Sequence, residues 1–313
     1  MKILVTGSIA YDTIMVFPDR FRNHLLPEQL HILNVCFLTP EMRREFGGTA
    51  GNIAYNLRLL GEQPLVMASV GEDSEPYLAR LRALGIDTGL LKRIAGQFTA
   101  QAFITTDLDD NQITAFHPGA MNHSHEGHVT RALGAGLAII GPDGKEGMLQ
   151  HARECEQAGV PYLFDPGQGL PMFSRDELLG FLKSASYVAL NDYEGRMLEE
   201  KTGEPLERLA RGAKALVCTQ GAKGSLIFSN GQRHEIPCVP AAAVLDPTGC
   251  GDAYRAALLF GIARGWDWPS VGRLGALMGA LKIARRGAQN HTATPESLES
   301  QFRDTFGYSP WKG

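Results

Sequence analysis

Residues 246–252 read Asp-Pro-Thr-Gly-Cys-Gly-Asp, and the ten that follow, Ala-Tyr-Arg-Ala-Ala-Leu-Leu-Phe-Gly-Ile, are almost entirely apolar. A glycine-rich turn before such a run is typical of the start of a buried helix. Amides at a helix start point into one concavity and carry partial positive charge, which suits a phosphate. Asp252 would repel a phosphate, so a role in moving a proton or orienting a hydroxyl explains it. The structural alternative is a capping carboxylate, because Asp is favoured near helix starts.

The rest of the chain alternates short apolar runs with helical segments. This rhythm predicts an α/β fold, with a mainly parallel sheet and helices on both faces. The expected strands are residues 3–6, 64–69, 137–140, 162–165, 187–190 and 215–219. The expected helices are residues 51–60, 75–84, 145–158, 176–183, 193–201, 252–264, 270–285 and 295–303.

Two regions, residues 10–40 and 90–118, break this rhythm and alternate like strands. Residues 99–106 and 112–117 flank Asp107–Asn111, which predicts a hairpin with an acidic turn. A small antiparallel sheet of this kind is expected to act as a lid or as a subunit contact. We expect one domain over residues 1–313 with the lid inside it, and a loose tail over residues 308–313.

Composition excludes several classes of protein. The 313 residues are 44% apolar and 20% charged, with a net charge of −4, so no basic surface for nucleic acid is expected. No apolar stretch approaches the length needed to span a bilayer, and no signal-peptide core is evident. The five cysteines form no C-x-x-C motif, which favours free thiols and a cytoplasmic location.

Three motifs occur in a specific order: Phe46-Gly-Gly-Thr-Ala-Gly-Asn-Ile-Ala54, Asn191-Asp-Tyr-Glu194 and the turn at 246–252. Together they resemble the ribokinase/PfkB family of carbohydrate and nucleoside kinases, and the resemblance covers essentially the whole chain. It implies a three-layer α/β/α sandwich around a mainly parallel sheet, with a small β lid over the substrate.

Carried over position by position, the resemblance makes Asp252 the base that accepts the proton of the substrate hydroxyl. The amides of the preceding turn would hold the transferring phosphoryl group, and that turn consists of Gly249, Cys250 and Gly251. The family usually has Ala where this chain has Cys250; the amide is unchanged, so we expect the anion hole to survive. The residues that resemble the family's substrate-hydroxyl acid and sugar-binding turn are Asp12, Gly47, Gly48 and Asn52.

Other motifs resemble the donor side of the family's site. Asn191 and Glu194 match the N-x-x-E motif that helps to organise Mg²⁺ and phosphate, largely through water. The family often binds a potassium-like ion near the anion hole, and Asp246 is the side chain that we nominate for it. The nucleotide-binding turn and the segment bordering the adenine of ATP correspond to Thr219, Gly221, Gly224, Gly287 and Ala288.

The substrate expected from these residues is a nucleoside. Asp12 can accept hydrogen bonds from two neighbouring hydroxyls, which suits a ribose diol with its 5′-hydroxyl aimed at Asp252. The glycine motif and Asp165-Pro-Gly-Gln168 look most like the adenosine-kinase-like nucleoside kinases of prokaryotes. Phe116 and Met121 would then cover the base, and Gln168 would hydrogen-bond the base or the sugar. The expected activity is ATP- and Mg²⁺-dependent phosphorylation of the 5′-hydroxyl of a purine nucleoside such as adenosine.

Several alternatives stay open at this stage. A sugar kinase for ribose or a related furanose keeps the same motifs, and a non-catalytic sensor for a nucleoside or sugar would keep the fold. The weakest rival is a zinc hydrolase built on His117, His123, His125 and His128. Arg255 is the single charge on an apolar helix, and we expect it to pair with Asp246 or another buried carboxylate. The expected partners are a small substrate and ATP, with no nucleic acid or membrane, and a second copy of the chain is considered at the lid.

Overall fold

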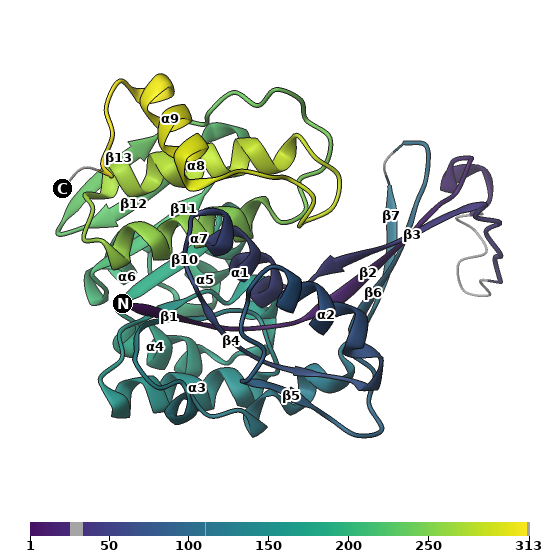
Figure 1. The fold of residues 1–313 in the computed structure, drawn as a ribbon, viewed down its shortest axis with the longest axis horizontal. Helices are drawn as coiled ribbons and strands as arrows, with labels where there is room; N and C mark the ends of the chain where they lie inside the picture. Colours follow the sequence, from purple (N-terminus) through teal and green to yellow (C-terminus); the bar gives the residue numbers. More distant parts are fainter. Residues whose placement is uncertain (26–33, 110, 312–313) are drawn as a thin grey trace.

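A computed structural model describes residues 1–25, 34–109 and 111–311. Over these residues the chain forms a nine-stranded sheet in the order β13-β12-β11-β10-β9-β8-β1-β4-β5. Figure 1 shows the sheet within the whole fold. The strands from β5 to β11 pair in parallel and only β12 and β13 are antiparallel, which confirms the expected α/β class. The bounds are β1 Lys2–Thr6, β4 Leu65–Val70, β5 Leu91–Arg93, β8 Ala135–Ile140, β9 Tyr162–Phe164, β10 Tyr187–Asn191, β11 Ala215–Thr219, β12 Ser225–Ser229 and β13 Gln232–Ile236.

Helices cover both faces of this sheet (Figure 1), because successive residues of each buried strand point to opposite sides. In β1, Ile3 and Val5 face one apolar core, and Leu4 faces the other. The first core is closed by α1 Thr49–Leu59, α2 Glu75–Ala83, α7 Cys250–Ala263, α8 Trp268–Ile283 and α9 Pro295–Phe306. The second is closed by α3 Lys145–Ala158, α4 Arg175–Ser184, α5 Asp192–Thr202 and α6 Leu206–Leu209.

A second, smaller sheet projects from the body as a long arm (Figure 1). Its order is β3-β2-β6-β7, with β2 Ala10–Val16, β3 Glu41–Gly47, β6 Ala100–Thr106 and β7 Gln112–His117. The lid bounds expected from sequence are wrong at two places: β3 lies beyond residue 40, and residues 91–93 pair with β4 in the main sheet. Period-two patterns identify strands but not the sheet that each one joins. Residues 26–33 of the expected lid lie outside the described residues.

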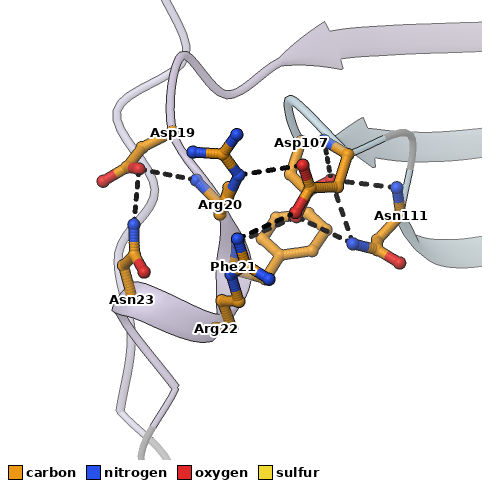
Figure 2. A network of polar contacts seen from close by, with 8 residues as sticks. Asp19, Arg20, Phe21, Arg22, Asn23, Asp107 and Asn111 are labelled. Atoms are coloured by element: carbon orange, nitrogen blue, oxygen red, sulfur yellow. Dashed lines mark hydrogen bonds and ion pairs between the residues drawn. The ribbon is translucent and has the colours of Figure 1, made fainter.

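The tip of the arm is held by the acidic turn (Figure 2). Asp107 accepts hydrogen bonds from the Phe21 amide at 2.9 Å and from the Asn111 amide at 2.9 Å. Arg20 donates to Asp109 at 2.8 Å, so the loop after β2 is fastened to the hairpin between β6 and β7. The hydrogen bonds from these neighbours outweigh the effect of burial and lower the pKa of Asp107. The carboxylates therefore fix the tip of the arm.

Two further elements differ from expectation. Residues 308–311 are packed rather than loose: the Tyr308 hydroxyl lies 2.8 Å from the Ser270 hydroxyl, and the Trp311 ring packs on Trp266 and Phe302. Aromatic contacts with Trp266, in the loop after α7, and with Phe302 on α9 fix this segment, and such contacts leave no local pattern. Within the described ranges, no helix is long and apolar enough to cross a membrane.

Candidate active site

The motif residues converge where the parallel strands end, the edge at which open α/β sheets bind ligands. Gly249 precedes α7, Gly48 precedes α1, and Asn191 ends β10. The base of the lid meets the same edge, because Gly47 ends β3 and pairs with Ala10 at the start of β2. Residues from four separate parts of the sequence therefore surround one site.

The glycine turn starts α7 as expected. Gly249 has φ +80°, a left-handed conformation, and a Cβ at this position would lie 2.8 Å from the Ala288 Cβ. A side chain at 249 would therefore push the turn away from the 287–288 segment. The Cys250 sulfur lies 3.8 Å from the Gly279 carbonyl oxygen, and burial raises the pKa of its thiol to about 11. The amides after Gly249 remain at the helix start, where positive potential suits an anion.

Asp252 is held by the α1 side of the site. The Asn52 side-chain amide donates to Asp252 Oδ2 at 2.8 Å. Gln289 Nε2 donates to Asn52 Oδ1 at 3.0 Å, so the Asn52 amide has one orientation. The same Gln289 nitrogen lies 2.7 Å from the Tyr77 hydroxyl, which donates to the Gly47 carbonyl at 2.6 Å. One buried chain of hydrogen bonds thus connects the glycine motif to the candidate base.

Both candidate carboxylates are harder to ionise than in water. Burial raises the pKa of Asp252 to about 6, and the Asp165 and Asp12 charges add to this effect against the Asn52 hydrogen bond. Burial also raises the pKa of Asp12 to about 6, assisted by Asp246 and Glu45. A carboxylate with a raised pKa is a better proton acceptor, and both groups are ionised near neutral pH.

Asp12 is the first of a row of three side chains on the lid. Strand register sets Asp12 opposite Ala102, and Ala102 opposite Phe116, so the three share one face of the lid. Ala102, the middle residue of the row, is small and buried. The Phe116 side chain is 51% exposed although it is a large aromatic residue. The arrangement can hold a molecule with hydroxyls at one end and a flat apolar part at the other.

A cavity of about 390 Å³ lies beside the end of α8 and the segment that follows it. It is formed between residues 239–242, α8 and α9, with Leu277, Leu281 and Asp304 in its wall. Arg285 and His291 also line it, and they bracket the segment expected to border a donor base. Its position fits the adenine of a nucleotide whose phosphates reach the α7 start.

Comparison with known proteins assigns the chain to a family. The model of the pfkB family carbohydrate kinases matches residues 10–295. The chain belongs to this family. It is 31% identical to a nucleoside kinase from Methanocaldococcus jannaschii over 94% of each chain, and 30% identical to one from Methanothermobacter thermautotrophicus over 98% and 97%. The nucleoside kinase of Burkholderia thailandensis in complex with inosine superposes with TM-score 0.90 at 50% identity, covering 98% of this chain and 99% of that one.

Membership of the PfkB family makes the chain a phosphotransferase with an alcohol as acceptor. The family's N-x-x-E residues form a capping box here: Asn191 Oδ1 accepts from the Glu194 amide, and Glu194 Oε2 from the Asn191 amide, both at 2.8 Å. Burial and the Asp165 charge raise the pKa of Glu194. Thr219 pairs with Asn191 on the neighbouring strand, so the two motifs meet at the sheet edge.

Arg255 joins these parts of the PfkB site from within the core. Its guanidinium donates to Asp165 at 2.9 and 3.2 Å and lies 3.8 Å from Glu194 Oε2. The expected pairing with a buried carboxylate is confirmed, and the partner is Asp165 rather than Asp246. This network and Gln289 escaped the sequence analysis, since their partners lie 90 and 237 residues away.

The remaining candidate residues are placed as follows. Gly221 and Gly224 flank the turn after β11, with φ +56° and +90°. Gln168 is exposed in the turn after β9, and Met121 lies in the 3₁₀ segment Gly119–Glu126, which packs on α3 and β4. Within the described residues no hydrogen bond joins Gln168 to Asp12, and the substrate roles of Met121 and Gln168 stay predictions.

The histidines of the cluster contact different carboxylates. His123 lies 3.1 Å from Glu126, and His128 lies 2.8 Å from Glu154. Within residues 1–25, 34–109 and 111–311, no group of three or more potential ligands is placed to hold a metal ion. The cluster therefore offers no support for zinc chemistry.

Proposed function

We propose that this PfkB-family enzyme transfers the γ-phosphoryl group of ATP, as its Mg²⁺ complex, to the 5′-hydroxyl of purine nucleosides. The observation that carries the proposal is the row of Asp12, Ala102 and Phe116 on the lid face beside Asp252. Its carboxylate suits a ribose diol, and its exposed ring suits a base. A bare sugar would leave the ring without a partner.

The proposed chemistry follows from the chain's own groups. Asp252 orients the acceptor hydroxyl and takes its proton as the new O–P bond forms, while ADP leaves with the electrons of the broken bond. The amides at the α7 start stabilise charge on the transferring group. Asp12 holds the sugar hydroxyls, and Asn52 keeps the Asp252 carboxylate in place at 2.8 Å. Positioning and charge neutralisation supply most of the rate enhancement in such a loose transition state.

The relatives support a nucleoside acceptor. The Burkholderia thailandensis structures are described as complexes of a nucleoside kinase with inosine and with ADP-inosine. At 50% and 51% identity over nearly the whole chain, the acceptor chemistry is expected to be shared. A purine base is large and flat, and the exposed Phe116 ring offers it a flat apolar surface. Gln168 and Met121 are proposed to complete the base pocket when the lid closes.

The donor side fits ATP and Mg²⁺. The adenine would occupy the cavity at α8 and α9, whose wall includes Arg285 and His291, on either side of Gly287 and Ala288 in the chain. The phosphates would then lie toward Gly221 and Gly224. Mg²⁺ would neutralise phosphate charge when bound. Both Glu194 oxygens already accept hydrogen bonds, at 2.8 Å from the Asn191 amide and side chain, so Glu194 would act on the ion through water.

The lid is proposed to pair with the lid of a second copy of the chain. Met42, Phe103 and Ile113 lie on its face opposite Asp12 and are 69%, 40% and 45% exposed. Within the described residues neither outer strand of the lid sheet pairs further, so two lids can pair edge to edge or face to face. A cytoplasmic location is proposed from the free thiols.

A substrate panel tests the proposal. ADP release from MgATP is measured with adenosine, inosine, guanosine, cytidine, ribose and fructose 6-phosphate. Turnover of purine nucleosides without turnover of ribose is expected. Phe116→Ala should raise the nucleoside KM and leave any ribose turnover unchanged, with Leu133→Ala, 78% exposed outside the lid, as the control. Preference for ribose would contradict the base pocket, and silence with every acceptor would contradict the kinase.

Asp252→Asn tests the base. The amide keeps the size of the side chain but cannot accept the proton, so kcat should fall by about 10²–10⁴-fold. Nucleoside binding, measured by calorimetry, should change little, because Asp12 and the lid hold the sugar and base. Near-normal turnover in this variant would show that Asp252 is not the base.

A further inference from the structure

A buried lysine lies directly behind the anion hole. The side chain of Lys282, in the last turn of α8, is fully buried. Its Nζ donates to the Asp246 carbonyl at 2.7 Å and to the Arg285 carbonyl at 3.1 Å. Among the described residues no carboxylate forms an ion pair with it, which is unusual for a buried charge. The end of a helix favours a cation, so α8 itself supports this position.

The two carbonyls belong to the two loops that shape the anion hole. Asp246 begins the glycine turn, and Arg285 begins the segment on which Gly249 packs. The same loops meet at two further points: the amides of Leu245 and Asp246 donate to the Ile283 carbonyl at 2.9 and 3.2 Å, and the Gly287 amide donates to Asp246 Oδ2 at 2.8 Å. Lys282 therefore connects the glycine turn to the segment after α8. The amides of that turn must stay in place during phosphoryl transfer.

A potassium-like ion beside Asp246 does not fit this arrangement. Asp246 Oδ1 accepts from the Thr248 amide and Oδ2 from the Gly287 amide, both at 2.8 Å, and the carbonyl accepts from Lys282. A cation bound to these oxygens would lie close to the Lys282 ammonium, and the two like charges would repel each other. Hydrogen bonds from Thr248 and Gly287 outweigh burial and lower the pKa of Asp246, so this carboxylate is already balanced by its neighbours.

We propose that the Lys282 ammonium is a built-in cation that organises the anion hole, and that the enzyme consequently needs no monovalent metal ion. An ammonium and a potassium ion both bind carbonyl oxygens and both carry a single positive charge. A tethered ammonium is always present, so the geometry of the turn does not depend on salt composition. Lys282 is thus a positioning residue, acting through the turn rather than on the substrate.

The inference rests on the proposed kinase function for its rate measurement, and thermal melting gives a second readout that does not depend on it. Wild-type kcat should agree within twofold between tetramethylammonium chloride and KCl at equal ionic strength, and its Tm should show no shift specific to K⁺. Saturable stimulation of the wild type by K⁺, or a K⁺-specific rise in its Tm, would overturn the proposal.

The matched variants are Lys282→Met and Lys201→Met. Lys201 Nζ also donates to two backbone carbonyls, those of Pro171 and Phe173 at 3.0 and 2.8 Å, but far from the glycine turn. In K⁺-free buffer we expect K282M to lose at least tenfold in kcat with a small change in nucleoside KM, and K201M to keep its kcat. If K282M kept the kcat of the wild type in the absence of K⁺, the proposal would be overturned. If K282M does not fold, the wild-type melting and rate measurements still decide the question.

Discussion

At the scale of single residues, the two carboxylates are the informative features. Asp12 and Asp252 come from opposite ends of the chain, and burial raises the pKa of each to about 6. The hydrogen bond from Asn52, which Gln289 orients, opposes this effect of burial on the pKa of Asp252, and the Arg255 charge opposes it as well. A pKa in this range keeps both groups ionised at neutral pH while making Asp252 a stronger base than an ordinary aspartate.

The pH dependence of turnover follows from these values. Both carboxylates must be ionised, so kcat/KM should be flat above about pH 7 and fall as pH drops through 6, with a slope between one and two. Asn52→Ala removes a hydrogen bond that lowers the pKa of Asp252, so the fall in kcat should move to higher pH. Steady-state kinetics from pH 4.5 to 9 measure both profiles. A fall centred near pH 4 would mean that neither carboxylate is perturbed.

At the scale of elements, helix starts position the chemistry. Gly48 precedes α1 with φ +82°, and a Cβ there would lie 2.5 Å from the Ala10 nitrogen and from the Ser8 carbonyl oxygen. The α1 start can therefore approach the β1–β2 turn only without a side chain. This approach sets Asn52, one turn later, within reach of Asp252.

Gly48→Ala should consequently harm both stability and substrate binding. We expect a loss of about 1–3 kcal/mol in the free energy of unfolding and a raised nucleoside KM. Gly203→Ala is the matched control, since Gly203 has φ +75° but open space around its Cβ position. Urea denaturation should show a smaller loss for G203A, with KM unchanged. Equal effects on stability and KM in the two variants would refute the steric explanation.

Arg255 is the element-scale connection between β9, α5 and α7. Removing it leaves Asp165 and Glu194 buried without a counter-charge, and breaking such a pair costs about 3–5 kcal/mol. Arg255→Met should lower the free energy of unfolding by that order, measured by urea denaturation. Arg303→Met removes an exposed pair with Glu299 at 3.1 Å and should cost about 0.3–0.5 kcal/mol. Similar losses in the two variants would show that the buried network contributes no more than a surface pair.

At the scale of the whole molecule, the projecting arm is the feature that suggests pairing with a second copy of the chain. Its inner face carries Asp12 and Phe116, and its outer face carries Met42, Phe103 and Ile113. Sedimentation velocity at micromolar concentration should give the mass of a dimer. Phe103→Asp should shift the protein to monomer and Leu133→Asp should not, because Leu133 lies outside the lid. A monomeric wild type would exclude pairing through the lid.

The sequence by itself determined the class of fold, the family resemblance and the glycine turn at the start of α7. These predictions rest on local signals that can be recognised in the sequence alone: apolar runs of strand and helix length, and glycines next to Asp252 and Asn52. The tertiary structure decided what depends on pairing across long separations: β3 in the lid, residues 91–93 in the main sheet, Arg255 with Asp165, and Gln289 with Asn52. The packed segment 308–311 and the Lys282 contacts belong to the same group. The physical reason is that a buried polar group needs a hydrogen-bond partner and a buried aromatic group needs packing neighbours. The fold supplies both from distant parts of the chain, so the residues near such a group in the sequence do not identify its partner.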